Sequence, residues 1–108
     1  MQLTEQIHNI ITGGVLKQLR ARAKLTGENV QDRLGLNPAI TSKIECGKQN
    51  ITFYHLQKLL PLYGSNILEF NKYFNRYVEE FHVHKAKLGA HMSDVDVAKY
   101  VSKHYIEV

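Results

Sequence analysis

The sequence contains a single cysteine, Cys46, and this excludes a disulfide framework within the chain. No apolar run approaches the roughly 20 residues that a helix needs to span a bilayer. The first ten residues, MQLTEQIHNI, lack the basic start and the long apolar run of a signal peptide. These absences predict a cytoplasmic chain that makes no contact with a membrane.

Motifs of catalysis are also missing. The sequence has no phosphate-binding loop, no catalytic-serine motif and no pattern of paired carboxylates, so we do not expect an enzyme. Six histidines are present, but His82 and His84 are two residues apart and fall on different faces of a helix. His91 and His104 have no obvious partners, so we expect no metal and no other cofactor. Cys46 has no histidine near it in the sequence and is predicted to be an inert, half-buried thiol.

Length and composition favour a small folded chain. Apolar residues make up 44% of the sequence, which argues against disorder, and 108 residues suit one domain or one domain with an appendage. The core of such a chain is small, and pairing with a second copy often adds stability. The formal net charge is +4, and residues 1–64 contain eight Lys or Arg against four acids, whereas residues 65–108 contain six of each. The first half is therefore expected to meet a polyanion, although +4 is also ordinary for a soluble protein.

The first predicted helix runs from the N-cap Thr4 to about Ala23. Apolar residues at helical spacing are expected to face the core: Ile7, Ile11, Val15 or Leu16, and Leu19. The pair Gly13-Gly14 interrupts this pattern, since each glycine costs roughly 1 kcal/mol in a helix interior relative to alanine. The pair either bends the helix or separates residues 3–12 as an arm.

Capping residues and glycines divide the next stretch into three more helices, predicted over residues 27–34, 38–46 and 53–63. Their N-caps are Thr26, Asn37 and Thr52. Pro38 suits the first position of the second of these helices, and Gly35 and Leu36 form the turn before it. The residues expected to face inward are Val30, Leu34, Thr41, Ile44, Phe53, Leu56, Leu59 and Leu60.

The segment LGLNPAITSKIECGK, residues 34–48, carries a family resemblance. Glycine in the turn, the apolar residue after it, the Ser-Lys-Ile-Glu run and the following Gly-Lys are typical of one group of proteins. Together with the leading LKQLR and the trailing capped helix, residues 11–70 resemble the lambda-repressor/Cro-like (XRE-type) helix-turn-helix DNA-binding family. The resemblance implies an all-α fold: a five-helix lambda-repressor-like domain with a long fifth helix, here followed by a C-terminal helical extension.

Three departures from the family pattern lie in the helix over residues 38–46, and they concern its packing and the residues that would read DNA. Thr41 stands at an inward position where the family usually has Ile or Val, and Cys46 stands where Arg or Asn is usual. Pro38, Ala39 and Ile40 replace the polar residues that commonly contact bases. With so few donors, specificity is expected to depend also on DNA shape and on half-site spacing.

The resemblance also implies a DNA-binding surface on residues 1–64. The helix over residues 38–46 would lie in the major groove, where Lys43 is expected to donate to guanine O6 and N7. Pro38 and Ala39 could make only apolar contacts, with thymine methyl groups, whereas Asn37 and Ser42 could bond a phosphate or a base edge. The residues expected at phosphates are Lys48, Gln49, Asn50, Arg22 and Lys24.

Residues 65–108 are predicted to be a helical dimerisation or interaction region. Ser65 is expected to cap a helix over residues 66–88, whose apolar positions repeat at steps of three and four. This helix would be about 34 Å long, so its second half is expected to meet another chain or the C-terminal segment. A last helix over residues 94–104 follows Ser93, and residues 89–92, Gly-Ala-His-Met, are either native or an engineered join. The predicted dimerisation residues are Phe74, Tyr77, Phe81, Leu88, Val97 and Val101.

These features together predict a prokaryotic or phage transcriptional regulator. We expect a repressor that binds double-stranded DNA as a homodimer on a palindromic operator. Two alternatives stay open. In the first, the chain is an antitoxin that regulates its own operon and binds a toxin through its C-terminal half. In the second, it is a protein-interaction module on the same fold.

Overall fold

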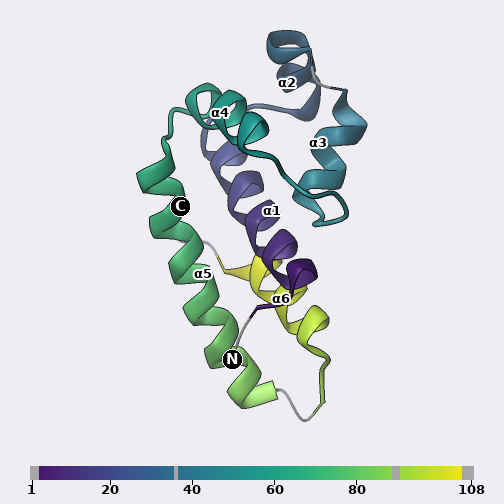
Figure 1. The fold of residues 1–108 in the computed structure, drawn as a ribbon, viewed down its shortest axis with the longest axis vertical. Coiled ribbons are helices and arrows are strands. Elements are labelled where there is room, and N and C mark those ends of the chain that lie inside the picture. The colour runs from purple at the N-terminus through teal and green to yellow at the C-terminus, as the bar shows by residue number, and fades with distance from the viewer. Residues whose placement is uncertain (1–2, 36, 89–90, 106–108) are drawn as a thin grey trace.

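The computed structural model describes residues 3–35, 37–88 and 91–105, and these form helices without any strand (Figure 1). This confirms the predicted all-α class. None of the described helices is both long and apolar enough to cross a membrane. The helices are α1 (Glu5–Arg22), α2 (Gly27–Leu34), α3 (Pro38–Glu45), α4 (Phe53–Leu62), α5 (Ile67–Leu88) and α6 (Asp94–His104).

The helix starts follow the predicted capping chemistry. Side-chain oxygens accept a backbone N–H of the first turn at five predicted N-caps: Thr4, Thr26, Asn37, Thr52 and Ser93. In α2 the cap is reciprocal, because Asn29 accepts from the backbone N–H of Thr26 at 2.9 Å. Gly35 ends α2 with φ +70°, as predicted for a glycine stop.

The predicted cap of α5 was wrong by one residue. The side-chain oxygen of Asn66 accepts from the backbone N–H of Glu69 at 2.9 Å. The hydroxyl of Ser65 instead donates to the carboxylate of Glu69, at 2.6 Å. The helix α5 therefore begins at Ile67, and Asn66 takes the capping role.

Helix α1 forms the centre of the core, and α3, α5 and α6 pack against it (Figure 1). Its middle is therefore buried on nearly every side rather than along the single predicted stripe. The buried residues of α1 are Ile7, Ile10, Ile11, Thr12, Gly13, Gly14, Val15, Leu16 and Leu19. The apolar side chains among them, from Ile7 to Leu19, belong to one continuous core with buried residues of α2 to α6.

The glycine pair does not separate an arm, because α1 is one helix from Glu5 to Arg22. Both glycines mark close approaches between helices. A Cβ added to Gly13 would clash with the backbone carbonyls of Ile44 and Glu45 at the end of α3. A Cβ added to Gly14 would lie 2.6 Å from Cβ of Ser102 in α6. The helix tolerates the low propensity of glycine here because two neighbours need the space.

The apolar seam of α5 meets the chain's own last helix. Tyr77 and Phe81 are 0% exposed, and so are Val97 and Val101 of α6, which packs against both α1 and α5. Four of the residues predicted to form a dimer interface are therefore internal, and they are not surface groups that a second copy could contact. The other two, Phe74 and Leu88, are half-buried. The seam was expected to meet either another chain or the C-terminal segment. In the structure the C-terminal segment, as α6, covers it.

Two further burial predictions were wrong. Phe53, expected in the core, is 64% exposed, because it is the first residue of α4 and the core is filled from the other end of that helix by Leu59 and Leu60. Cys46 is exposed rather than half-buried, since it caps the end of α3 at the surface. Leu36, expected in the turn before α3, lies outside the described residues. Residues 89–90, part of the segment that is either native or an engineered join, lie outside them too.

Candidate nucleic-acid interface

Helices α2 and α3 are two short helices joined by residues 35–37 and packed against each other at one end of the molecule (Figure 1). In α3, Thr41 and Ile44 face inward, with 4% and 2% of their surface exposed. This confirms the predicted inner face. Ala39, Ser42 and Lys43 are exposed, so the opposite face of α3 is open to a partner.

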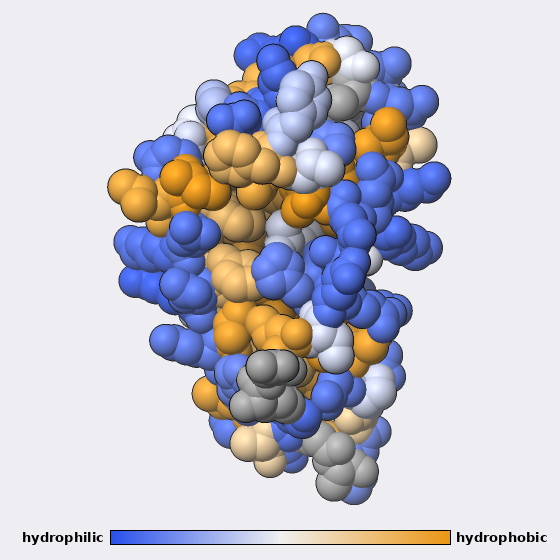
Figure 2. Space-filling view, viewed as in Figure 1, coloured by the Kyte–Doolittle hydropathy of each residue, from blue (hydrophilic) through white to orange (hydrophobic). Residues whose placement is uncertain are grey.

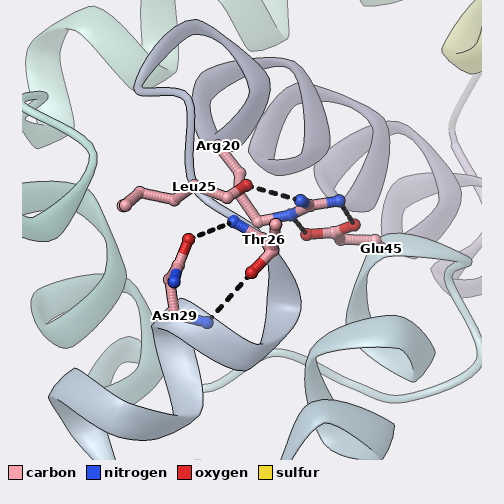
Figure 3. A network of polar contacts seen from close by, with 5 residues as sticks. All are labelled: Arg20, Leu25, Thr26, Asn29 and Glu45. Atoms are coloured by element: carbon pink, nitrogen blue, oxygen red, sulfur yellow. Dashed lines mark hydrogen bonds and ion pairs between the residues drawn. The ribbon is translucent and has the colours of Figure 1, made fainter.

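An ion pair fixes the end of α3 to α1. The Nε of Arg20 donates to one carboxylate oxygen of Glu45 at 2.7 Å, and an Nη donates to the other at 2.9 Å. The second Nη donates to the carbonyl of Leu25 at 2.7 Å, in the turn before α2 (Figure 3). The side chains are only 20% and 8% exposed, so this two-pronged contact is partly shielded from water. It ties α1, the start of α2 and the end of α3 together.

The pKa shifts at the Arg20–Glu45 pair keep the guanidinium charged and the neighbouring phenol of Tyr63 neutral. The hydrogen bond to Glu45 raises the pKa of Arg20 despite partial burial, so the guanidinium stays charged. Burial raises the pKa of Tyr63, and the negative charge of Glu45 adds to this shift, so the phenol stays neutral beside the pair. The contact was missed at the level of sequence, although Arg20 ends the quoted LKQLR segment and Glu45 ends the Ser-Lys-Ile-Glu run.

Close backbone contact also holds the loop after α3. Gly47 has φ +74°, and a Cβ there would lie 2.7 Å from the backbone of Ile10 in α1. Only glycine satisfies both the left-handed backbone and this approach. Gly13 of α1 lies against the last carbonyls of α3 in the same way. The end of α3 and the loop after it therefore contact the α1 backbone directly.

The residues predicted to bind DNA fall mostly on the surface. The exposed ones are Asn37, Ala39, Ser42, Lys43, Lys48, Asn50, Arg22 and Lys24, whereas Gln49 is half-buried. Pro38 opens α3, and its side chain lies outside the described part. The side-chain oxygen of Asn37 accepts from Ala39 N–H at 2.8 Å, which leaves its amide nitrogen to donate to a ligand.

Two of these residues are engaged elsewhere in the chain. Arg22 donates to Glu69 of α5 at 2.7 Å, and this hydrogen bond raises the pKa of Arg22 and lowers that of Glu69. The side-chain oxygen of Asn50 accepts from the amide of Asn9 in α1. Arg22 therefore joins α1 to α5, and a phosphate would have to compete with Glu69 for it.

The sequence did not predict that lysines from separate parts of the chain line one groove. A groove of about 320 Å³ between α1, the end of α3 and α6 is lined by four lysines: Lys17, Lys48, Lys99 and Lys103. Lys17 and Lys48 were recognisable as basic residues near the predicted interface. Lys99 and Lys103 stand one helical turn apart on α6, and only the packing of α6 against α1 brings them to this groove.

The histidines and acids of the described residues form no group of three that could hold a metal ion. No protein-family model, no curated protein and no solved structure matches the chain. Its function must therefore be inferred from the residues and their arrangement.

Proposed function

We propose that this chain is a sequence-specific, double-stranded DNA-binding transcriptional regulator that acts as a repressor. In this proposal α2 and α3 form a helix-turn-helix unit of the lambda-repressor-like type, and α3 enters the major groove. One observation carries the proposal. The inner side of α3 is fixed to α1 by Arg20 and Glu45, while its outer side exposes Ala39, Ser42 and Lys43.

A fixed helix with an open outer face suits base reading because the side chains arrive already oriented. Lys43 would donate to guanine, and Ser42 would bond a base edge or a phosphate. Lys48 and Asn50, in the loop after α3, would contact the phosphate strand, which adds affinity without sequence preference. Figure 2 shows mainly hydrophilic side chains over α2 and α3, as expected for a surface that meets DNA.

Binding as a homodimer requires an exposed pairing surface, and the predicted seam is internal. Large exposed apolar side chains instead gather at the starts of α4 and α5: Phe53 (64%), Tyr54 (60%), Ile67 (41%) and Leu68 (78%). A groove of about 360 Å³ beside Phe53 and Ile67 is lined by apolar residues of both helices and also by Gln57, Ser65 and Asn66. We call the four exposed apolar side chains the apolar patch. Figure 2 shows apolar surface continuing from this region along α5.

A second copy is the occupant that we propose for the apolar patch. The start of α5 and α3 lie on opposite sides of the molecule in Figure 1, which is 44 × 24 × 22 Å in extent. Pairing through the patch would separate the two α3 helices by less than two widths of 24 Å. That range includes the spacing of about 34 Å between successive major grooves on one face of DNA.

Selection of bound sequences from random duplex DNA tests this function directly. We expect enrichment of a palindromic site whose half-site centres are about 10 base pairs apart, or a multiple of this. Binding should weaken steeply as salt rises, because phosphate contacts release counterions. A pool with no enriched sequence and no salt-dependent binding would contradict the proposal and would favour the protein-interaction module.

A further inference from the structure

We propose that α6 is part of the DNA-binding surface and that its Lys99 and Lys103 contact phosphates flanking the half-site. The inference rests on the proposed function and extends it, because the family resemblance ends before α6 begins. It assigns the lysine groove between α1, α3 and α6 to the backbone of the same duplex that α3 reads. The described structure otherwise leaves the exposed face of α6 without a role.

The four lysines converge from separate parts of the chain. Lys17 comes from α1, Lys48 from the loop after α3, and Lys99 and Lys103 from α6, yet all line one groove. All four are exposed, and none forms an ion pair with another described residue. The resulting positive field favours a ligand that carries several negative charges in a row.

Acidic groups near the groove do not cancel this charge. Glu45 lines the groove, but its two oxygens are taken by Arg20, so that pair is neutral as a whole. Glu5 lines the neighbouring groove, which also contains Lys48 and Lys99. The acids of α6, Asp94 and Asp96, lie in its first turn, whereas Lys103 is in its last.

The position of α6 is fixed rather than adjustable. The hydroxyl of Ser102 donates to the carbonyl of Ile10 in α1 at 3.1 Å, and Ser102 also meets Gly14 at close range. Val97, Ala98 and Val101 are completely buried beneath the helix. Ser102 and Lys103 line the same groove as Cys46 at the end of α3 and Lys48 just after it. The α6 lysines thus continue the surface that begins in the loop expected to follow a phosphate strand.

A phosphate duplex fits this groove better than a small anion. The groove is open, its four lysines come from α1, α6 and the loop after α3, and none of the described buried side chains with an unpartnered polar atom lines it to grip a single phosphate. Lysines on flexible stems act as point charges that neutralise a row of phosphates. We therefore commit to flanking DNA, and a small phosphate-bearing molecule becomes an outcome of the test.

The test uses the full chain with Lys99→Gln and Lys103→Gln together, and two duplexes that carry the selected site. One duplex ends at the site and the other has one further helical turn, about 10 base pairs, on each side. For the wild type we expect tighter binding to the longer duplex. For the double variant we expect this gain to disappear and the slope of log K against log salt to become shallower by about 3.6, for two lost contacts in each protomer of the dimer.

Lys72→Gln with Lys87→Gln provides the matched control, because both lysines are exposed on α5 and the charge change is the same. This control should keep the gain from flanking DNA. An α6 variant that keeps the wild-type gain and salt slope would overturn the inference while leaving the proposed function intact. A wild type that binds neither duplex would overturn both.

Inorganic phosphate distinguishes the second source of the same chemistry. Titrated against chloride at matched ionic strength, it should not displace the longer duplex from the wild type more than chloride does. Displacement by inorganic phosphate that the α6 double variant abolishes would identify a small-anion site and would overturn the assignment to flanking DNA.

Discussion

Glu45 ends α3, and both of its carboxylate oxygens accept hydrogen bonds from the guanidinium of Arg20 in the last turn of α1. The same guanidinium holds the carbonyl of Leu25, just before Thr26 caps α2 (Figure 3). One arginine therefore fixes the three elements whose relative positions decide how α3 is presented. Removing one member would leave a shielded charge without its partner.

Glu45→Gln should lower the free energy of unfolding by about 2 kcal/mol and weaken DNA binding, because the end of α3 loses its fixed seat on α1. Urea unfolding and duplex binding measure the two effects. Glu69→Gln is the control, since the Arg22–Glu69 pair is about one-third exposed on both sides and should contribute less than about 1 kcal/mol. Equal losses for the two variants would contradict the special role of Arg20 and Glu45.

Gly13→Ala separates helix propensity from packing. Propensity alone predicts a gain of about 1 kcal/mol, because alanine is the better helix former. The structure predicts a loss of about 2 kcal/mol, since the new methyl group would clash with backbone carbonyls of α3 that cannot rotate away. Thermal or urea unfolding decides the sign. Ala21→Gly, at an exposed position of α1, should show the ordinary propensity cost of no more than about 1 kcal/mol.

Lys43 and Lys48 should differ in how they affect DNA binding. Lys43→Ala is expected to cost about 1–3 kcal/mol at the preferred site and to relax preference at one base pair of each half-site. Lys48→Ala should weaken binding to all sequences alike and flatten the salt slope. Binding measured on the preferred site, on single-base variants and on unrelated DNA distinguishes the two. Identical behaviour would remove the distinction between base reader and phosphate contact.

The apolar patch predicts the oligomeric state. Leu68→Glu would place a charge in the proposed interface and should shift the chain toward a monomer in sedimentation experiments. Val83→Glu is the control, because Val83 is also exposed on α5 (44%) but lies outside the patch. If Leu68→Glu leaves a wild-type dimer unchanged, or if the wild type is monomeric at high concentration both with and without DNA, the pairing surface is wrong.

The buried phenol of Tyr77 predicts a loss of stability at alkaline pH. Its burial raises the pKa of the phenol to about 12, and its hydroxyl has no hydrogen-bond partner among the described residues. The unfolded chain releases this proton near pH 10, whereas the folded chain keeps it, so stability should fall as pH rises from 10 towards 12. Tyr77→Phe should cost little at pH 7 and should make the decline above pH 10 shallower. Urea unfolding across this range checks both effects.

Local chemistry explains which parts of the structure were predictable from sequence. A cap such as Thr26 with Asn29 acts within four residues, so the start of α2 could be predicted without knowledge of the fold. The turn glycine Gly35 and the inward positions Thr41 and Ile44 are local in the same sense. The seam of α5 is different, because Phe81 would be apolar whether it met α6 or a second copy. Only the path of the chain after Leu88 decides between these partners.

The same limit applies to the candidate site. Lys43 and Lys48 could be predicted because they lie within the segment that resembles a known motif. Lys99 and Lys103 could not, since their place beside Lys48 depends on α6 returning to α1. The Gly13-Gly14 pair was misinterpreted for a related reason: propensity describes an isolated helix, whereas the close contacts with α3 and α6 belong to the folded chain.

The hydrogen bond from Ser102 to Ile10 joins residues 92 positions apart. During synthesis, α2 and α3 leave the ribosome before α6, so the side of α1 that α6 covers stays in water until α6 has emerged. Contacts of such long sequence separation also slow folding, because a large loop must close before they form. A chain terminated before α6 would thus carry α2 and α3 in full and would still expose the apolar surface that chaperones and proteases recognise.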